Sequence, residues 1–237
     1  MVVPFPEGVG SLGNGLYFVI LAAVGAFLLY VLIRRKRIRV VAAITGFAIT
    51  TAVFLVSAVF LSALFSIYYV GYEDLLIILI SIAITALADY EIFRTKGSGN
   101  ILTLLFLGGS LGAFLGTTIP WLSAVVILIF LAIYDVYAVF RGSVGKIATA
   151  EGLEQLRGLT VSFKEVQIGL GDLTFYSMLT SLVLSTAGPY FYIASLVGVV
   201  FGAFLSFKLL EKKGIFPGLP FSIALGLTPL IIWLLLQ

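Results

Sequence analysis

The stretch VQIGLGDLTFYSML, residues 166–179, places an aspartate inside an apolar run. Asp172 follows Gly171 directly and Gly169 by three positions. A charged aspartate at the centre of a bilayer costs about 2.5–3.5 kcal/mol on insertion scales. If this stretch lies in a membrane, the chain carries Asp172 at a cost in stability, and the residue becomes a candidate for function.

The composition of the 237-residue chain is that of an integral membrane protein. Apolar residues make up 61% of it and charged residues 11%, with a mean hydropathy of +1.20, whereas soluble globular chains have roughly 25% charged residues. The sequence has no Cys and no His, which excludes disulfides, thiol catalysis, Ser-His triads and the common zinc sites. The net charge of +3 comes from residues that flank apolar runs, so it does not predict nucleic-acid binding.

Charges, Gly and Pro divide the chain into eight apolar segments, and a helix needs about 20 such residues to cross a bilayer. We predict helices over 16–33, 40–69, 75–93, 101–117, 121–141, 163–185, 190–208 and 217–236. Two boundaries rest on turn chemistry alone, at GTTIP (116–120) and AGP (187–189). The sequence therefore predicts an all-α multi-pass membrane protein, a helical bundle of about eight transmembrane helices.

The distribution of positive charge supports this number of crossings. All 14 Lys and Arg residues fall in alternate loops, on one side of the membrane, and cytoplasmic loops are the ones enriched in such residues. The opposite loops contain Glu7, Glu73 and Asp74 instead. We therefore expect both termini outside and the longest loop, 142–162, in the cytoplasm as a solvated linker with at most one interfacial helical turn.

Two aspartates stand out among the acidic residues. Asp89 lies close to Arg94, so local pairing near the interface would account for it. Asp135 and Asp172 have no basic residue within four positions. A single aspartate of this kind is also explained by a helix-packing hydrogen bond or by a protonated, hydrogen-bonded carboxyl.

Their matched depth favours a joint role. Asp135 precedes Arg141 by six residues and Asp172 follows Lys164 by eight, which corresponds to depths of about 9 and 12 Å at the helical rise. The two helices are consecutive and antiparallel, so we expect the carboxyls to face each other. Two neighbouring carboxyls do not both ionise easily and share a proton, which is the division into acid and base that aspartic proteases use.

Glycines and prolines accompany this pair. Gly169 and Gly171 cost roughly 1 kcal/mol each in a helix, and they would let another backbone or a substrate strand approach Asp172; ordinary small-residue helix packing is the alternative. In IFPGLPFSI (215–223), Pro217 and Pro220 open the last segment on the cytoplasmic side. They either simply start a helix or leave irregular backbone near the aspartates.

Together these residues resemble a known family. YD at 134–135, GLGD at 169–172 and PGLP at 217–220 look like the YD, GxGD and PAL motifs of presenilins and signal peptide peptidases, which are intramembrane aspartyl proteases. Each motif alone is weak or moderate, but their order, helix placement and orientation all agree. The short loop and the lack of extra domains look most like the archaeal presenilin homologues.

The resemblance implies a function for the whole chain. Asp135 and Asp172 would be the catalytic pair. Around them, Tyr134, Gly169, Leu170 and Gly171 would shape the site, and Pro217, Gly218, Leu219 and Pro220 would bind substrate. The chain would be a single protease domain over 1–237, with N-terminal helices over 16–141, the cytoplasmic loop 142–162 and the C-terminal GxGD and PAL helices over 163–237. It would cleave transmembrane segments of other proteins in the bilayer, without metal, cofactor or nucleic acid. A homo-oligomer is possible.

The sequence departs from the family in two ways. The family has nine crossings; the segment 16–33 resembles its second, so the first would lie upstream. Gly218 stands where the family usually has Ala.

Two other functions remain as alternatives. A transporter or channel would also use intramembrane aspartates, although no internal repeat is visible in the sequence. A scaffold without catalysis would tolerate the loss of both aspartates.

Overall fold

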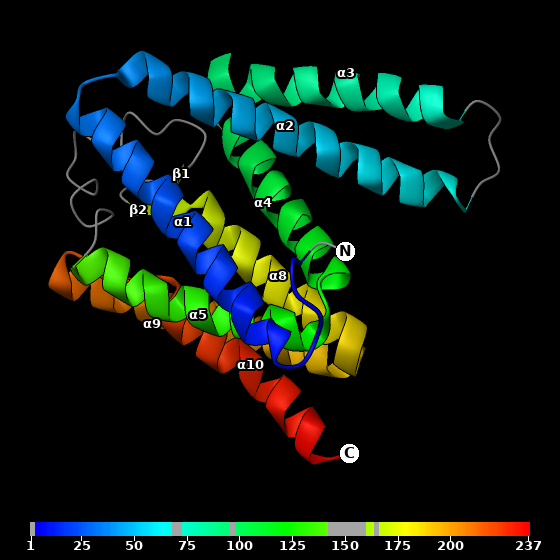
Figure 1. Cartoon of the computed structure of the whole chain (residues 1–237), viewed down its shortest axis with the longest axis vertical. Helices are drawn as coiled ribbons and strands as arrows, with labels where there is room; N and C mark the ends of the chain where they lie inside the picture. The colour runs from blue at the N-terminus through cyan, green and yellow to red at the C-terminus, as the bar shows by residue number, and fades with distance from the viewer. Residues whose placement is uncertain (1–2, 68–72, 95–97, 142–159, 164–165) are drawn as a thin grey trace.

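The structure, a computed structural model, describes residues 3–67, 73–94, 98–141, 160–163 and 166–237. The described residues form eight helices, which confirms the all-α membrane bundle (Figure 1). They are α1 (Gly10–Arg34), α2 (Ile38–Phe65), α3 (Glu73–Arg94), α4 (Ser98–Thr118), α5 (Trp121–Phe140), α8 (Leu170–Ala187), α9 (Pro189–Lys213) and α10 (Leu219–Leu235). The helical turn considered within the loop 142–162 lies outside the described residues, which resume at 160.

Six of the described helices are long and apolar enough to cross a membrane, so the protein is an integral multi-pass membrane protein. The two that do not meet this measure are α8, whose hydropathy is lowered by Asp172 and several hydroxyl side chains, and α10, which has 17 residues. In Figure 1, α5 and α9 end together at the lower left, and α1 ends above them at the upper left. Basic residues follow or close each of these three helices.

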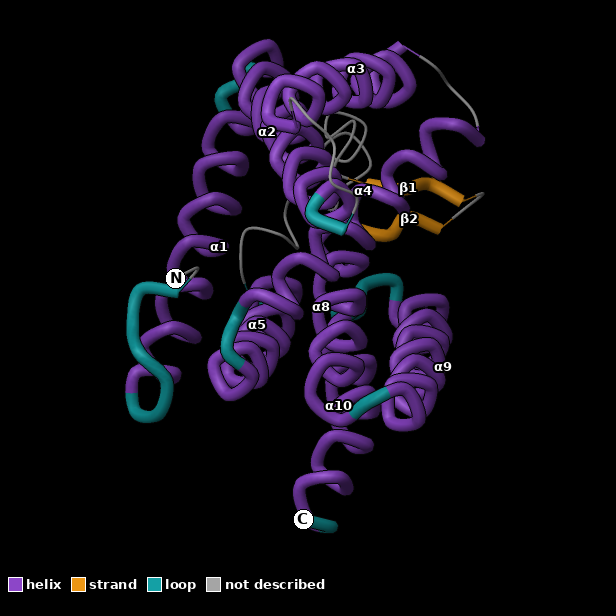
Figure 2. The backbone as a smooth tube through the Cα atoms, turned by 90° about the vertical axis from the view of Figure 1, so that its right-hand side faces the viewer, coloured by secondary structure: helices purple, strands orange, loops and turns teal. Residues whose placement is uncertain are grey.

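The start of α8 differs from the prediction. The apolar pattern predicted a helix from 163, but α8 begins at Leu170, and a hairpin of β1 (Thr160–Phe163) and antiparallel β2 (Val166–Gly169) precedes it (Figure 2). Val161, Val166 and Ile168 are β-branched and favour strands, and Gly169 is a poor helix former. The strand therefore ends three residues before Asp172.

Two apolar clusters hold the helices together. The larger one joins α5, α8, α9 and α10 through residues that include Leu128, Leu179 and Leu230. The smaller one joins α2, α3 and α4, and it also contains Leu170 at the first position of α8. Because α8 contributes to both clusters, it connects the two halves of the molecule.

Asp89 has a different partner from the one expected. Its Oδ2 accepts a hydrogen bond of 2.8 Å from the Thr50 hydroxyl on α2, whereas the sequence predicted pairing with Arg94. The packing of α3 on α2 brings Thr50 within reach of Oδ2, whereas the buried Oδ1 has no hydrogen-bond partner among the described residues. Asp89 therefore links α2 and α3, and it lies far in sequence from Asp135 and Asp172.

A stripe of glycines fits α4 against α8. Gly108, Gly112 and Gly116 recur every four residues and so share one face of α4. A Cβ on Gly112 would overlap the carbonyl oxygen of Thr174, and one on Gly116 would overlap that of Met178. Such close contact between backbones is typical of membrane helix pairs with small residues at the interface, and it fixes the position of α8 and hence of Asp172.

This contact gives a first prediction. We expect Gly112→Ala to lower the apparent Tm of the purified protein, because overpacking of a close interface costs about 1–3 kcal/mol. Gly109→Ala is the matched control, since a Cβ there meets nothing within 4 Å and alanine is the better helix former by about 1 kcal/mol. Circular dichroism during heating in detergent measures both. Equal Tm values for the two variants would contradict the close packing.

Small residues also place the start of α10. A Cβ on Gly202 of α9 would lie 2.5 Å from the Phe221 carbonyl oxygen, and one on Gly198 would lie 2.6 Å from that of Leu225. The Ser195 hydroxyl donates a 2.7 Å hydrogen bond to the Gly226 carbonyl. These contacts hold α10 directly against α9, so residues 215–218 lie at the same end of the bundle as Asp172.

Candidate active site

Three segments far apart in the sequence meet at one place. Asp135 lies on α5, Asp172 lies in the first turn of α8, and Gly218 precedes α10. Figure 1 shows α5, α8 and α10 side by side, and residues of α10 pack on both other helices. The structure thus brings the two aspartates and the PGLP segment together.

Asp135 is held by the backbone of the PGLP segment. Its Oδ2 accepts a 3.0 Å hydrogen bond from the Leu219 amide. Leu219 is the first residue of α10, where a backbone amide has no partner within the helix. The Asp135 carboxyl therefore accepts the hydrogen bond of an amide that has no partner within α10.

Asp172 lies close to the same segment. A Cβ built on Gly218 would lie 3.0 Å from Asp172 Oδ2 and 3.4 Å from its Cγ. Asp135 and Asp172 are also close enough to interact electrostatically. The two half-buried carboxyls therefore both lie close to a single peptide unit, Gly218–Leu219. Glycine at 218 leaves the space that Asp172 uses.

The carbonyl of that peptide unit is surrounded by hydroxyl groups. The Gly218 carbonyl oxygen accepts a 3.0 Å hydrogen bond from the Tyr176 hydroxyl on α8. It also accepts longer hydrogen bonds from Ser206 on α9, at 3.3 Å, and from Ser222 on α10, at 3.5 Å. We call these three residues the hydroxyl clamp. The clamp fixes the Gly218–Leu219 peptide unit and, through it, the amide that binds Asp135.

Sequence reasoning did not single out the clamp. Tyr176 lies four residues after Asp172 and thus on the same face of α8, which was the one available signal. Ser206 continues the spacing of Gly198 and Gly202 along α9. Serines and tyrosines are common in transmembrane helices, however, and only the folded arrangement shows that these three converge.

The prolines and Leu219 shape the start of α10. Residues 215–217 are non-helical, Pro217 is buried, and Pro220 occupies the second position of the helix, where a missing amide does no harm. The Leu219 side chain is buried in the larger apolar cluster. Leu219 therefore contacts Asp135 through its backbone, while its side chain anchors the segment.

The remaining predicted residues lie at different distances from the pair. A Cβ on Gly169 would lie 3.6 Å from Asp172 Oδ2, but one on Gly171 would meet only the Phe175 ring, at 3.8 Å. Leu170 is buried in the α2–α4 cluster, so it anchors the first turn of α8. Tyr134 is half-buried directly before Asp135. Among the described residues, no group of three or more acidic, His or Cys side chains is arranged to hold a metal ion.

Comparison with known proteins places the fold. No family model and no curated protein matches the sequence. Two solved structures of a presenilin family intramembrane aspartate protease, in the C222 and P2 space groups, match over the whole of this chain. Their TM-scores are 0.68 and 0.65, their identities 19% and 20%, and the match covers 89% and 87% of those chains. The resemblance to presenilins seen in three short motifs is thus confirmed at the level of the fold.

Proposed function

We propose that this protein is an intramembrane aspartyl protease of the GxGD type, with Asp135 and Asp172 as its catalytic pair. One observation carries the proposal: carboxyls from two different helices lie close to the same peptide unit, inside a helical bundle with the presenilin fold. Neither aspartate has an ion-pair partner among the described residues. An arrangement that served only to tie helices together would not need two carboxyls at one point.

The proposed reaction is hydrolysis by a shared proton. The ionised carboxyl takes a proton from a water molecule as the water oxygen attacks the carbonyl carbon of the substrate peptide bond. The protonated carboxyl donates its proton to the carbonyl oxygen. When the C–N bond breaks, the leaving nitrogen takes a proton from the pair, and the new carboxyl and amine separate. Protein carboxyls and water suffice for these steps, with no metal or cofactor.

The proposed substrate is a transmembrane segment of another protein, unwound near the cut. β2 ends at Gly169, three residues before Asp172, and in the described part of the chain it pairs only with β1. An extended substrate could add to its other edge or pair with the non-helical backbone at 215–217, as in strand addition. The whole chain, 1–237, would act as one domain, with its site nearer the cytoplasmic side.

Incubation of the purified protein with a labelled transmembrane peptide tests the proposal. We expect fragments cut within the apolar stretch, and we expect an aspartyl-protease transition-state analogue to suppress them. Proteoliposomes loaded with a proton-sensitive dye test the transport alternative under the same conditions. Proton flux without peptide cleavage would overturn the protease assignment.

The hydroxyl clamp gives a further prediction. Tyr176→Phe removes the 3.0 Å hydrogen bond to the Gly218 carbonyl but keeps the ring. A hydrogen bond contributes about 1 kcal/mol, so we expect kcat to fall by up to about tenfold as the peptide unit beside the aspartates loosens. Tyr190→Phe, at an exposed position of α9, is the matched control. Equal kcat values for the two variants would mean that the clamp does not position the site.

A further inference from the structure

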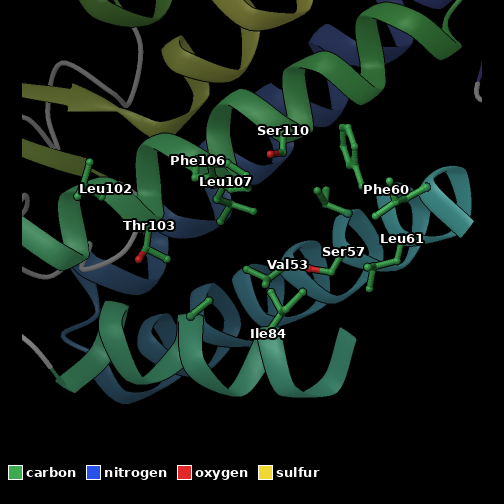
Figure 3. A pocket seen from close by; sticks show the side chains of 13 residues that line it. Val53, Ser57, Phe60, Leu61, Ile84, Leu102, Thr103, Phe106, Leu107 and Ser110 are labelled. Carbon is green, nitrogen blue, oxygen red and sulfur yellow. The ribbon is translucent and has the colours of Figure 1, made fainter. Parts of the chain in front are cut away.

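An apolar cavity lies between α2, α3 and α4, away from the aspartate pair (Figure 3). Its volume is about 600 Å³, within the range of roughly 300–1,000 Å³ typical of small-molecule sites. Figure 3 shows Val53, Ser57 and Phe60 of α2 opposite Phe106, Leu107 and Ser110 of α4. The lining contains three hydroxyl groups and no charged side chain, so a charged ligand has no ion-pair partner there.

The geometry points to one occupant, and we propose that this cavity binds the acyl chain of a membrane lipid. Its α2 wall runs from Val53 to Leu64, which is about 17 Å at the helical rise. One leaflet of a bilayer has a hydrocarbon depth of about 15 Å, half of the core. The cavity therefore has the length of an acyl chain that enters from one leaflet.

The volume of the cavity is large enough for an acyl chain. A water molecule's share of liquid volume is roughly 30 Å³, so at that size the cavity has room for about 20 methylene-sized groups. A transmembrane helix, about 10 Å wide, is the competing apolar occupant, and the experiment below distinguishes it from an acyl chain.

The mouth of the cavity faces lipid. Phe106 is 78% exposed, Leu102 66% and Phe60 46%, and all three belong to membrane-spanning helices. Lipid chains are therefore the most concentrated apolar molecules at this opening. Filling the cavity restores the dispersion contacts that its lining otherwise lacks.

The occupied cavity would also support α8. The lining residues Val53 and Leu107 belong to the same cluster as Leu170 at the start of α8. On its other side, α4 is joined to α8 by the glycine stripe and by the Ser177 hydroxyl, which donates a 2.6 Å hydrogen bond to the Gly109 carbonyl. An acyl chain between α2 and α4 therefore packs behind the helix that carries Asp172.

Photolabelling in vesicles tests this proposal without relying on peptide cleavage. The protein is reconstituted in phosphatidylcholine that carries a diazirine midway along one acyl chain, irradiated, digested and mapped by mass spectrometry. We expect adducts on lining residues of α2 and α4 in excess over the lipid-facing residues of α9. Adducts spread evenly over all these helices would overturn the proposal, because they would show ordinary contact with bulk lipid.

Filling the cavity provides the matched comparison. Ser57→Phe with Ser110→Phe should reduce labelling of the lining at least tenfold relative to α9, which corresponds to about 1.4 kcal/mol of lost binding. Ala194→Phe, at an exposed position of α9, should leave it unchanged. Unchanged labelling in the filled variant would contradict an acyl-chain site, as would displacement of the label by a transmembrane peptide. If the double variant does not fold, Ser57→Phe alone and the wild-type map still decide the question.

Discussion

Asp135→Asn and Asp172→Asn should each reduce kcat for cleavage of a transmembrane peptide by about 10³-fold or more. A positioned acid or base contributes about 10²–10⁴-fold, and neither carboxyl can perform both halves of a shared-proton mechanism. The double variant should be no worse than either single one, because residues that act as a unit are strongly non-additive. The pH–rate profile of the wild type should be bell-shaped and should report on the pair.

Asp89→Asn is the matched control for this experiment. Asp89 also lies within a membrane-spanning helix, but its carboxyl accepts from Thr50, and an asparagine oxygen can still accept there. We expect this variant to cleave at the wild-type rate. Substantial activity in either site variant would contradict the catalytic assignment. A comparable loss in Asp89→Asn would show that the loss comes from changing a carboxyl within the membrane and not from catalysis.

Gly218→Val should reduce kcat by about 10²-fold while the protein remains folded. The Gly218 backbone has φ −80° and ψ −39°, which any L-residue adopts without strain. The obstacle is purely steric, because a Cβ would lie 3.0 Å from Asp172 Oδ2, and the Cγ atoms of valine add further bulk there. A misplacement of about 1 Å at a reacting group can cost 10²-fold, so displacement of the carboxyl is expected to be severe.

Two further variants separate this steric effect from a general loss of stability. Gly218→Ala adds only the Cβ, and we expect a smaller loss, since the Asp172 side chain can move by a few tenths of an ångström. Gly171→Val is adjacent to Asp172 in sequence, yet apart from its two chain neighbours a Cβ there meets only the Phe175 ring, at 3.8 Å, so its activity should remain close to that of the wild type. Peptide cleavage and apparent Tm are measured for all three. If Gly171→Val and Gly218→Val lose activity equally, the proximity of Gly218 to Asp172 has no catalytic role.

The helices and their order could be predicted because lipid imposes one simple rule. A crossing needs a run of apolar residues, and charges together with GTTIP and AGP mark where each run ends. Gly188, inside AGP, has φ +88° and separates α8 from α9, so that boundary was correctly predicted. The all-α bundle followed from these local signals without knowledge of any contact.

The start of α8 could not be predicted in the same way. Apolar content does not distinguish a strand from a helix over a short run, and the segment 163–169 was assigned to the helix for that reason. Pairing of Thr160 with Gly169 decides the matter, and that contact is not encoded in either segment alone. The glycine stripe on α4 was visible as a spacing of four, but its partner helix was not.

In the candidate site too, some features could be predicted from local sequence signals and others depend on how the helices pack. The matched depth of the aspartates could be estimated from flanking charges, and the PGLP segment could be placed on the same side. The hydroxyl clamp depends on α8, α9 and α10 meeting at one carbonyl. Convergence of single side chains from three helices is a property of packing, which periodicity along one helix does not contain.

The most direct test of the central claim is the mass of the products from one synthetic transmembrane peptide, incubated in water labelled with a heavy oxygen isotope. For the wild type, we predict two fragments cut within the apolar stretch, with one labelled oxygen in the new carboxyl group. Asp135→Asn and Asp172→Asn should yield neither fragment, while Asp89→Asn should yield both. Labelled fragments from either site variant at the wild-type rate, or an intact peptide with the folded wild type, would contradict the assignment of these two aspartates as the catalytic pair.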